Sequence, residues 1–421
     1  MAANQVDTFG KQLLEEEPDY IYKYKGFIPI RVLGMINDLA GVSESGQKAV
    51  QLNAFINVKT AEKKLQFGPE KCHTLTIAHK SVKSVATNLY IDHWSETHDD
   101  KNHLVEHFQG KIQMKNFSEQ KHLGFILGED GTNMKNIKVK QNRAIGIKKQ
   151  IEYMIKGLGK YTLEGGMVFL NSLLRSSILF ASETMYNIKE DEFRSIERIE
   201  EDLLRIFFKT TRGCPIFQLY FESGHIPARF VIKRMKILFF RYIITQKETS
   251  LMYRFIMAQK KNYVKGDWYS DVKNVLKEFE IELSEESIQN IPEGVFKKLV
   301  RDKTYSAAFK YLKVKQTRGS KGADIKYTLI ELQDYLNPFA NLTLEDQRYI
   351  FSLRSKMNEI KNNFPKDRNM KIVYCVKQCN TELDNEHITW CKFMNKENDY
   401  KYAHILNGDI SEKKEALKKL N

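Results

Sequence analysis

The chain has 421 residues, of which 42% are hydrophobic and 11% aromatic, so it can form two or three domains, each with its own core. Only 22 glycines and 8 prolines are present, which argues against long low-complexity linkers. Lysine and arginine outnumber aspartate and glutamate by 67 to 53, and a net charge of +14 favours an anionic partner such as nucleic acid, with solubility alone as the alternative.

The five cysteines do not have the pattern of a disulfide framework, because three of them lie close together near the C-terminus. This clustering favours metal binding in a reducing compartment, either the nucleus or the cytoplasm. The first residues lack the apolar core of a signal peptide. The most apolar stretch, residues 167–185, contains Arg175 and Glu183, so we expect no membrane partner.

Residues 1–150 predict a domain of mixed α and β structure. Short apolar runs rich in β-branched residues alternate with a helical pattern at 47–65, and a strand is expected at 73–77. A further strand, followed by a turn, is expected at 122–127.

Residues 32–43, VLGMINDLAGVS, form two apolar arms around the polar pair Asn37-Asp38. Asn and Asp tolerate the positive φ angles of a tight primed turn, so this segment predicts a β-hairpin. The pattern by itself indicates structure and no particular activity.

A basic run follows the strand predicted at 122–127. It includes Lys138, Lys140 and Arg143, interleaved with apolar residues. This spacing suits a surface that packs on the protein with one side and faces phosphate with the other. A solvated amphipathic face is the alternative.

The pattern becomes helical from residue 151. We expect a helical domain at 151–260, a helical region at 261–365, a Cys/His segment at 366–400 and a charged tail at 401–421. In the first of these, one helix has apolar residues at three- and four-residue spacing, with Glu and Arg on the other face and Asp191 as its expected cap. Its apolar residues are Phe193, Ile196, Ile199, Leu203 and Phe207.

Two further helices are predicted, one at 228–245 and one at 344–364, the latter closed by Pro365. The first of them carries four cations: Lys233, Arg234, Lys236 and Arg241. It is the best candidate for a helix that contacts phosphates. The alternative is a core helix whose cations extend to the surface.

Four residues near the C-terminus have knuckle-like spacing: Cys375, Cys379, His387 and Cys391. Zn²⁺ favours four such ligands in a tetrahedron, so the segment predicts a zinc site, with a loop of reduced thiols as the alternative. The first two cysteines have three residues between them instead of the commoner two. Tyr374 and Trp390 are available to stack on bases, which makes the segment a candidate for nucleic-acid binding.

The stretch from Asn4 to Ile77 contains the motifs DTFGKQ (7–12), LGMINDL (33–39), Asn53, LQFG (65–68) and EKC (70–72). These motifs resemble the palm of a reverse transcriptase from a non-LTR (LINE-like) retrotransposon. The resemblance continues from mid-palm to the C-terminus. It implies an α+β fold, in which a partial palm with an antiparallel sheet is followed by a mostly helical thumb and a CCHC zinc knuckle.

In that family the hairpin carries two adjacent aspartates, and a third comes from an earlier strand. Together they hold the two Mg²⁺ ions of an RNA-directed DNA polymerase. Here the first hairpin position is Asn37, whose amide oxygen brings no charge, and no earlier acid stands in a strand of the expected kind. Asp38 is the one carboxylate left as a residual magnesium ligand. The resemblance therefore implies a truncated polymerase, without fingers, that is inactive by itself and does not bind Mg²⁺ productively.

The resemblance also suggests roles for other residues. Lys71 corresponds to a lysine near the incoming triphosphate, although a lysine after a turn is usually just solvated. His122, Leu123 and Gly124 correspond to the primer grip, and residues 170–185 to the start of the thumb. The implied partners are RNA and DNA as template and primer and, for a chain acting in trans, an intact retrotransposon polymerase.

Three hypotheses follow from these patterns. The chain is an inactivated polymerase remnant, a non-catalytic RNA- or DNA-binding module that acts through its thumb and knuckle, or a decayed fragment with no selected role.

Overall fold

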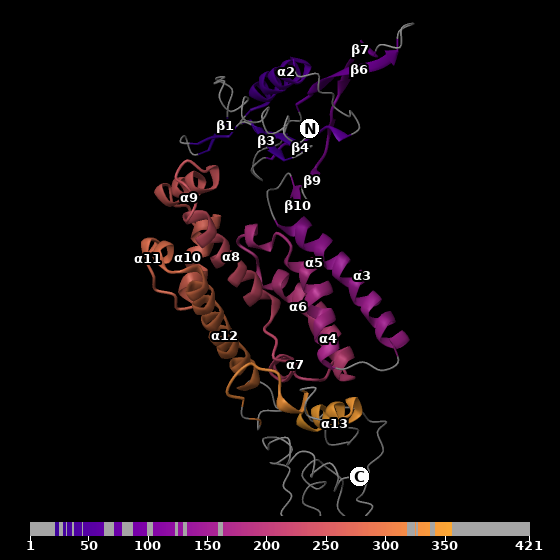
Figure 1. The fold of residues 1–421 in the computed structure, drawn as a ribbon, viewed down its shortest axis with the longest axis vertical. Helices are drawn as coiled ribbons and strands as arrows, with labels where there is room; N and C mark the ends of the chain where they lie inside the picture. The colour runs from indigo at the N-terminus through magenta and orange to yellow at the C-terminus, as the bar shows by residue number, and fades with distance from the viewer. Residues whose placement is uncertain are drawn as a thin grey trace, which may run out of the picture. The chain divides into compact units, whose positions relative to one another are not determined.

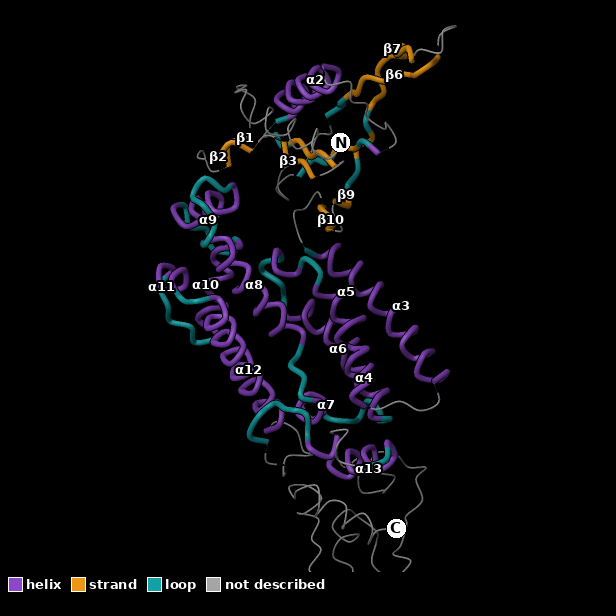
Figure 2. Tube along the Cα trace, in the orientation of Figure 1, coloured by secondary structure: helices purple, strands orange, loops and turns teal. Residues whose placement is uncertain are grey.

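The structure is a computed structural model, and it describes residues 22–24, 28–30, 32–35, 38–43, 45–62, 71–77, 87–98, 104–122, 125–128, 133–158, 163–317, 325, 327–336 and 342–355. The chain divides into two compact units. Unit 1 comprises Met1–Asn136 and Tyr242–Ser270, and unit 2 comprises Ile137–Arg241 and Asp271–Asn421. All the described strands belong to unit 1, whereas unit 2 is helical (Figures 1 and 2). The α+β class predicted from the sequence is confirmed at this level.

Unit 1 contains ten short strands among its described residues. They are β1 (Tyr22–Tyr24), β2 (Ile28–Ile30), β3 (Val32–Met35), β4 (Asp38–Gly41), β5 (His73–Thr74), β6 (Tyr90–His98), β7 (Leu104–Gln113), β8 (Lys115–Asn116), β9 (Glu119–His122) and β10 (Phe125–Gly128). The pairs β1–β2, β3–β4, β6–β7 and β9–β10 are antiparallel, and β5–β8 is parallel. Two helices, α2 (Gly46–Glu62) and α9 (Leu251–Lys261), belong to the same unit. Helices stabilise small sheets that are marginal in isolation.

The hairpin predicted at 32–43 is present as β3 and β4. Its ladder pairs Met35 with Asp38, so the two connecting residues are 36 and 37, which lie outside the described part of the chain. The connection therefore falls one position before the predicted turn centre Asn37-Asp38, and Asp38 opens β4 as the partner of Met35. The reason is that the residues closing a two-residue hairpin loop already belong to the ladder.

Two predicted strands differ in the structure. The strand expected at 73–77 ends at Thr74, because its partner β8 offers only two residues for pairing. The strand expected at 122–127 is instead split between β9 and β10. His122 pairs with Phe125, so the two strands form an antiparallel pair, and residues 123 and 124 between them lie outside the described part of the chain.

Helix α2 confirms the helix predicted at 47–65, although it begins at Gly46 and ends at Glu62. Two of its asparagines attach it to β6. The side-chain amides of Asn53 (2.5 Å) and Asn57 (3.0 Å) both donate to the carbonyl oxygen of Tyr90. Since Asn57 is buried, its amide fixes the position of the helix on the strand.

Unit 2 holds most of the helices. They are α3 (Met134–Leu158), α4 (Leu163–Phe169), the π-helix η2 (Leu170–Arg175), α5 (Ser176–Leu179), the 3-10 helix η3 (Ser182–Thr184), α6 (Glu190–Phe208), α7 (Ile216–Ser223), α8 (Ala228–Ile244), α10 (Trp268–Glu278), α11 (Glu285–Asn290), α12 (Glu293–Thr317), the 3-10 helix η4 (Asp334–Leu336) and α13 (Leu344–Arg354). The first residues of α3 and α10 and the last residues of α8 fall in unit 1. The helix predicted at 344–364 begins at the expected residue but ends at Arg354, and residues beyond 355 lie outside the described part.

Helix α6 is the predicted apolar helix, and its five apolar positions from Phe193 to Phe207 are all buried. Asp191 does not cap it. The helix starts after Lys189, and the Glu192 carboxylate accepts a hydrogen bond from the Lys189 N–H (2.7 Å). A carboxylate in the first turn meets unpaired N–H groups there, so Glu192 satisfies one of them from inside the helix.

Helix α8 confirms the helix predicted at 228–245, ending at Ile244. The apolar stretch at 167–185 is not a single helix but the succession α4, η2, α5 and η3. Among the described helices, none combines the length and apolar character that crossing a membrane requires.

Candidate functional site

The residual metal position predicted at the hairpin is Asp38, the first residue of β4, and Asn37 lies outside the described residues. Lys71 is exposed and stands two residues before β5. No group of three or more His, Cys, Asp or Glu side chains that could hold a metal occurs within the described ranges. The magnesium site and the role of Lys71 stay predictions.

The primer-grip-like segment is a hairpin attached to α3. His122 ends β9, and Leu123 and Gly124 fall outside the described residues. The buried Asn136 side chain accepts a hydrogen bond from the Ile126 N–H (2.6 Å) and donates one to the Ile126 carbonyl oxygen (2.5 Å). Asn136 thus replaces a strand neighbour for β10 and fixes the strand at the first turn of α3.

The three basic residues predicted on the segment after this hairpin have different environments on α3. Lys138 and Arg143 are exposed, whereas Lys140 is buried. The Lys140 ammonium donates to the carbonyl oxygens of Ile178 (2.9 Å) and Phe180. These carbonyls end α5, where backbone oxygens lack helical partners and carry partial negative charge. Lys140 therefore acts inside the protein, and its position does not support the predicted contact with nucleic acid.

Two of the cations predicted on α8 are ion-paired within unit 2. Lys236 is 2% exposed and donates to the carboxylate of Asp271 on α10. Lys233 donates to both carboxylate oxygens of Glu278 on the same helix (2.7 and 2.6 Å). These two pairs hold α8 against α10. The alternative weighed for this helix was a core helix whose cations extend to the surface, and it does not describe Lys236, whose ammonium is buried against an acid.

The other two cations of α8 are also partly buried. Arg241 Nη2 donates to the carbonyl oxygen of Ile291 (2.7 Å), after the end of α11. Arg234 is half-buried, and burial lowers the pKa of its guanidinium because the charged form loses hydration. The surface of α8 therefore presents less unpaired positive charge than its sequence suggests.

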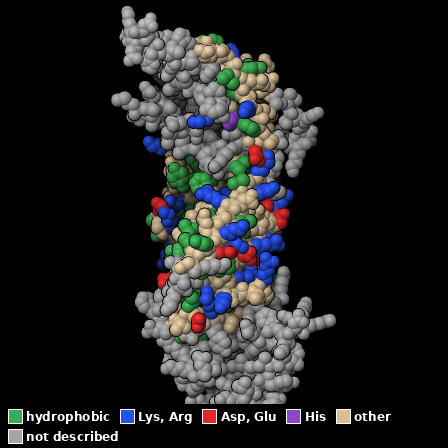
Figure 3. Space-filling model, turned by 90° about the vertical axis from the view of Figure 1, so that its right-hand side faces the viewer, with side chains coloured by type: hydrophobic (Ala, Val, Ile, Leu, Met, Phe, Trp, Pro, Cys, Tyr) green, Lys and Arg blue, Asp and Glu red, His purple; other side chains and the backbone are tan. Residues whose placement is uncertain are grey.

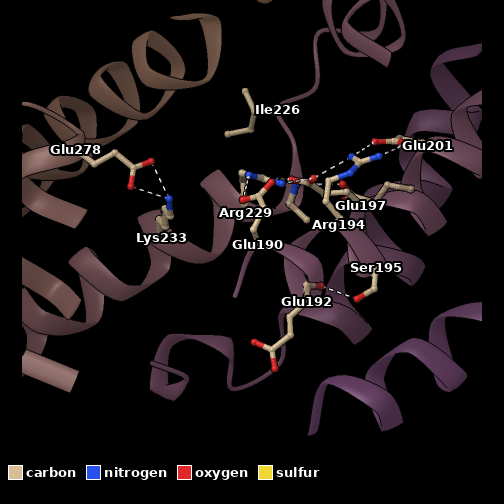
Figure 4. A network of polar contacts seen from close by, with 12 residues as sticks. Glu190, Glu192, Arg194, Ser195, Glu197, Glu201, Ile226, Arg229, Lys233 and Glu278 are labelled. Carbon is tan, nitrogen blue, oxygen red and sulfur yellow. Dashed lines mark hydrogen bonds and ion pairs between the residues drawn. The ribbon is translucent and has the colours of Figure 1, made fainter. Parts of the chain in front are cut away.

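A polar network between α6 and α8 was not predicted (Figure 4). Arg229 of α8 donates two hydrogen bonds to Glu197 (2.5 and 2.8 Å) and one to Glu190 (2.7 Å). Arg194 donates to Glu201 (2.7 Å) and Glu197 (3.2 Å). The expectation that the glutamates of α6 lie on a face away from its buried residues is wrong for Glu197 and Glu201. Both are buried because arginines match their charges.

Glu200, three residues after Glu197 on α6, is also paired with an arginine. It accepts hydrogen bonds from Arg175 Nε (2.7 Å) and from the Ala228 N–H (3.1 Å), and Arg175 also donates to the Ile226 carbonyl oxygen (2.6 Å). Burial raises the pKa of Glu200, and Arg175 opposes that shift. Arg175, which interrupts the apolar stretch at 167–185, thus supplies the charge that a buried carboxylate requires.

A second unpredicted cluster, the Glu222 cluster, joins α7 to the segment at 327–355. The Glu222 carboxylate is fully buried and accepts hydrogen bonds from the hydroxyls of Tyr327 and Tyr335 (2.8 Å for the latter) and from Arg354 Nε (2.8 Å). Burial and the nearby carboxylate raise the pKa of both tyrosines, so their hydroxyls stay protonated as donors. All the partners of this acid come from more than a hundred residues later in the chain.

The backbone beside this cluster allows only a very small residue. Gly224 has φ +70°, and a Cβ there would lie 2.4 Å from the Leu332 nitrogen and 2.8 Å from the Glu331 carbonyl carbon. Ser223 pairs with Leu332 in an isolated bridge. The sequence does contain a signal for the cluster, namely an acid inside the apolar run 216–223, because a buried acid needs partners.

The predicted zinc and stacking residues lie outside the described part of the chain. They are Tyr374, Cys375, Cys379, His387, Trp390 and Cys391. The zinc knuckle therefore stays a prediction.

Replacing Glu222 by Gln should destabilise the protein by about 3 kcal/mol or more, because the Arg354 charge would stay buried without its counter-ion. Urea unfolding followed by circular dichroism measures the change. The matched control is Glu282→Gln at an exposed position, where we expect a change within about 0.5 kcal/mol. Equal stability of the two variants would contradict the role assigned to Glu222.

Lys140 should make the stability depend on alkaline pH. Burial lowers its pKa from 10.5 to about 8, against the opposing effect of Glu183. Between about pH 8 and pH 10.5, Lys140 is protonated in the unfolded chain and neutral in the folded chain. The cost of burying its charge therefore disappears as the pH rises. The unfolding free energy of the wild type, relative to Lys140→Met, should increase by up to about 3 kcal/mol from pH 7.5 to 10.5. A pH-independent difference between the two proteins would disprove this assignment.

No protein-family model matches the chain, and no curated protein matches it. The resemblance to a reverse transcriptase rests on the motifs of the sequence alone and stays a prediction.

Proposed function

We propose that the chain derives from the C-terminal part of a non-LTR retrotransposon reverse transcriptase, cannot polymerise DNA by itself, and retains surfaces for RNA or DNA. The observation that carries the proposal is the β3–β4 hairpin. It forms where the motif LGMINDL (33–39) requires one, with Asp38 directly after the connection.

The loss of polymerase activity follows from charge. Two Mg²⁺ ions need several anionic oxygens to bind side by side, and transfer of a nucleotide depends on both ions. Of the hairpin pair, Asn37 is neutral and Asp38 alone is anionic. With the earlier aspartate also missing from the pattern, the remaining carboxylate cannot hold both ions.

The second candidate, a non-catalytic nucleic-acid-binding module, is favoured by α3. Lys138 and Arg143 of this helix are exposed, so their availability to phosphate does not depend on whether the β3–β4 hairpin binds metal. The chain as a whole carries a net charge of +14. The expected partners are RNA and DNA in the nucleus or cytoplasm, or an intact polymerase on a shared template. The matched charges around α6 argue against a decayed fragment, since an unpaired buried charge costs several kcal/mol.

The 421-residue chain should show no Mg²⁺-dependent extension of a DNA primer on an RNA template. Asn37→Asp should not restore synthesis, because one further aspartate is still missing. An active reverse transcriptase under the same conditions serves as the positive control. Templated synthesis by the wild type would overturn the proposed loss of activity.

Zinc should bind at one ion per chain and support retention on RNA. We expect Cys379→Ser and His387→Ala together to abolish the zinc, measured by metal analysis, and to weaken salt-dependent retention on an RNA column. Cys72→Ser, outside the knuckle, is the control and should keep both properties. If the double variant keeps its zinc and its retention, the knuckle has no part in binding.

A further inference from the structure

Helix α3 presents a line of residues to solvent that no element of the described chain covers. Lys138, Asn142, Gly146, Lys149 and Tyr153 follow one another at three- or four-residue spacing, so they share one side of the helix, and all are exposed. The line spans roughly 22 Å at 1.5 Å per residue. Tyr153, at its end, is 80% exposed, an unusual degree of exposure for an aromatic side chain.

The positive charge along this line is not neutralised within the described residues. Lys138, Lys149 and the adjacent Arg143 have no hydrogen-bond or ion-pair partner there, in contrast to the lysines of α8. Glu152 is the one acid of α3, and its Oε1 atom lies 3.9 Å from Nζ of Lys148, which is outside the line. On the side of the protein drawn in Figure 3, lysine and arginine side chains are exposed, with acidic side chains among them.

Gly146 has no packing reason to be a glycine. A Cβ there would meet no atom within 4 Å, and an interior glycine destabilises a helix relative to alanine. What the glycine provides is access, because a ligand can approach the helix backbone closely where no side chain intervenes. It stands between Asn142 and Lys149, at the centre of the line.

We propose that this face of α3 binds single-stranded nucleic acid. The choice of nucleic acid as the partner rests on the proposed function. Lys138 and Lys149 contact phosphates from the line itself, Arg143 reaches the phosphates from its flank, about 100° around the helix, and Tyr153 stacks on an unpaired base. A duplex buries its base faces, so an isolated exposed tyrosine ring beside cations fits a single strand better. RNA and DNA share this chemistry, and the experiment distinguishes them.

The test uses the full chain and fluorescence anisotropy with labelled single strands of about 12 nucleotides, within the usual range of site sizes. Oligouridine, oligothymidine and a duplex of matched length are compared. We expect both single strands to bind more tightly than the duplex, and Tyr153→Ala to weaken their binding about fivefold or more. Tyr153→Phe should retain the affinity, because it keeps the ring. Tyr263→Ala, at another exposed tyrosine, is the matched control and should bind like the wild type.

The outcomes separate the two proposals. The wild type is also compared with the double variant Lys138→Glu/Lys149→Glu, which should bind more weakly. If both this variant and Tyr153→Ala bind nucleic acid as tightly as the wild type, the α3 assignment is wrong and the proposed function stands. Preference for the duplex also overturns the α3 assignment. If no nucleic acid binds even at low salt, the binding part of the proposed function fails as well. Circular dichroism of each variant verifies folding, which substitutions at these exposed positions should leave intact.

Discussion

The packing of unit 2 depends on neutralising the acids that α6 brings into the interior. Glu197, Glu200 and Glu201 are all buried, and a buried carboxylate without a partner costs several kcal/mol. Glu201 is matched by Arg194 of α6 itself, whereas Glu197 is matched by Arg229 of α8 and Glu200 by Arg175 of η2. Because Arg229 and Arg175 each connect two elements, the contacts that neutralise these two acids also set where α8 and η2 lie on α6.

This constraint decides which cations can reach a ligand. On α8, Arg229 and Lys236 are oriented towards acids of the protein, so a helix rich in basic residues offers little charge to solvent. On α3, buried Lys140 closes the end of α5, while Lys138 and Lys149 lie on the exposed side. Within the described part of unit 2, the lysines of α8 and Lys140 of α3 are engaged in contacts that stabilise the fold, whereas Lys138 and Lys149 of α3 are exposed.

Local patterns predicted much of the fold. The polar pair after VLGMI indicated the β3–β4 hairpin, and the apolar spacing from Phe193 to Phe207 indicated α6, because both signals depend on neighbours in sequence. Pairing over long distances in sequence was not predictable in this way. The ends of β5 are set by β8, and the burial of Glu222 is set by Arg354, more than a hundred residues later. Sequence periodicity assigned the α6 acids to an exposed face, since it cannot show that arginines of other elements reach them.

If the cations of α8 stabilise the protein and those of α3 are available to a ligand, a bound RNA strand should protect α3 and leave α8 unchanged. Hydrogen–deuterium exchange of the 421-residue chain, with and without a saturating RNA single strand, distinguishes the two helices. We expect slower amide exchange along residues 138–153 when RNA is bound, with residues 228–244 unchanged. Slower exchange at 228–244 together with no change at 138–153 would contradict it.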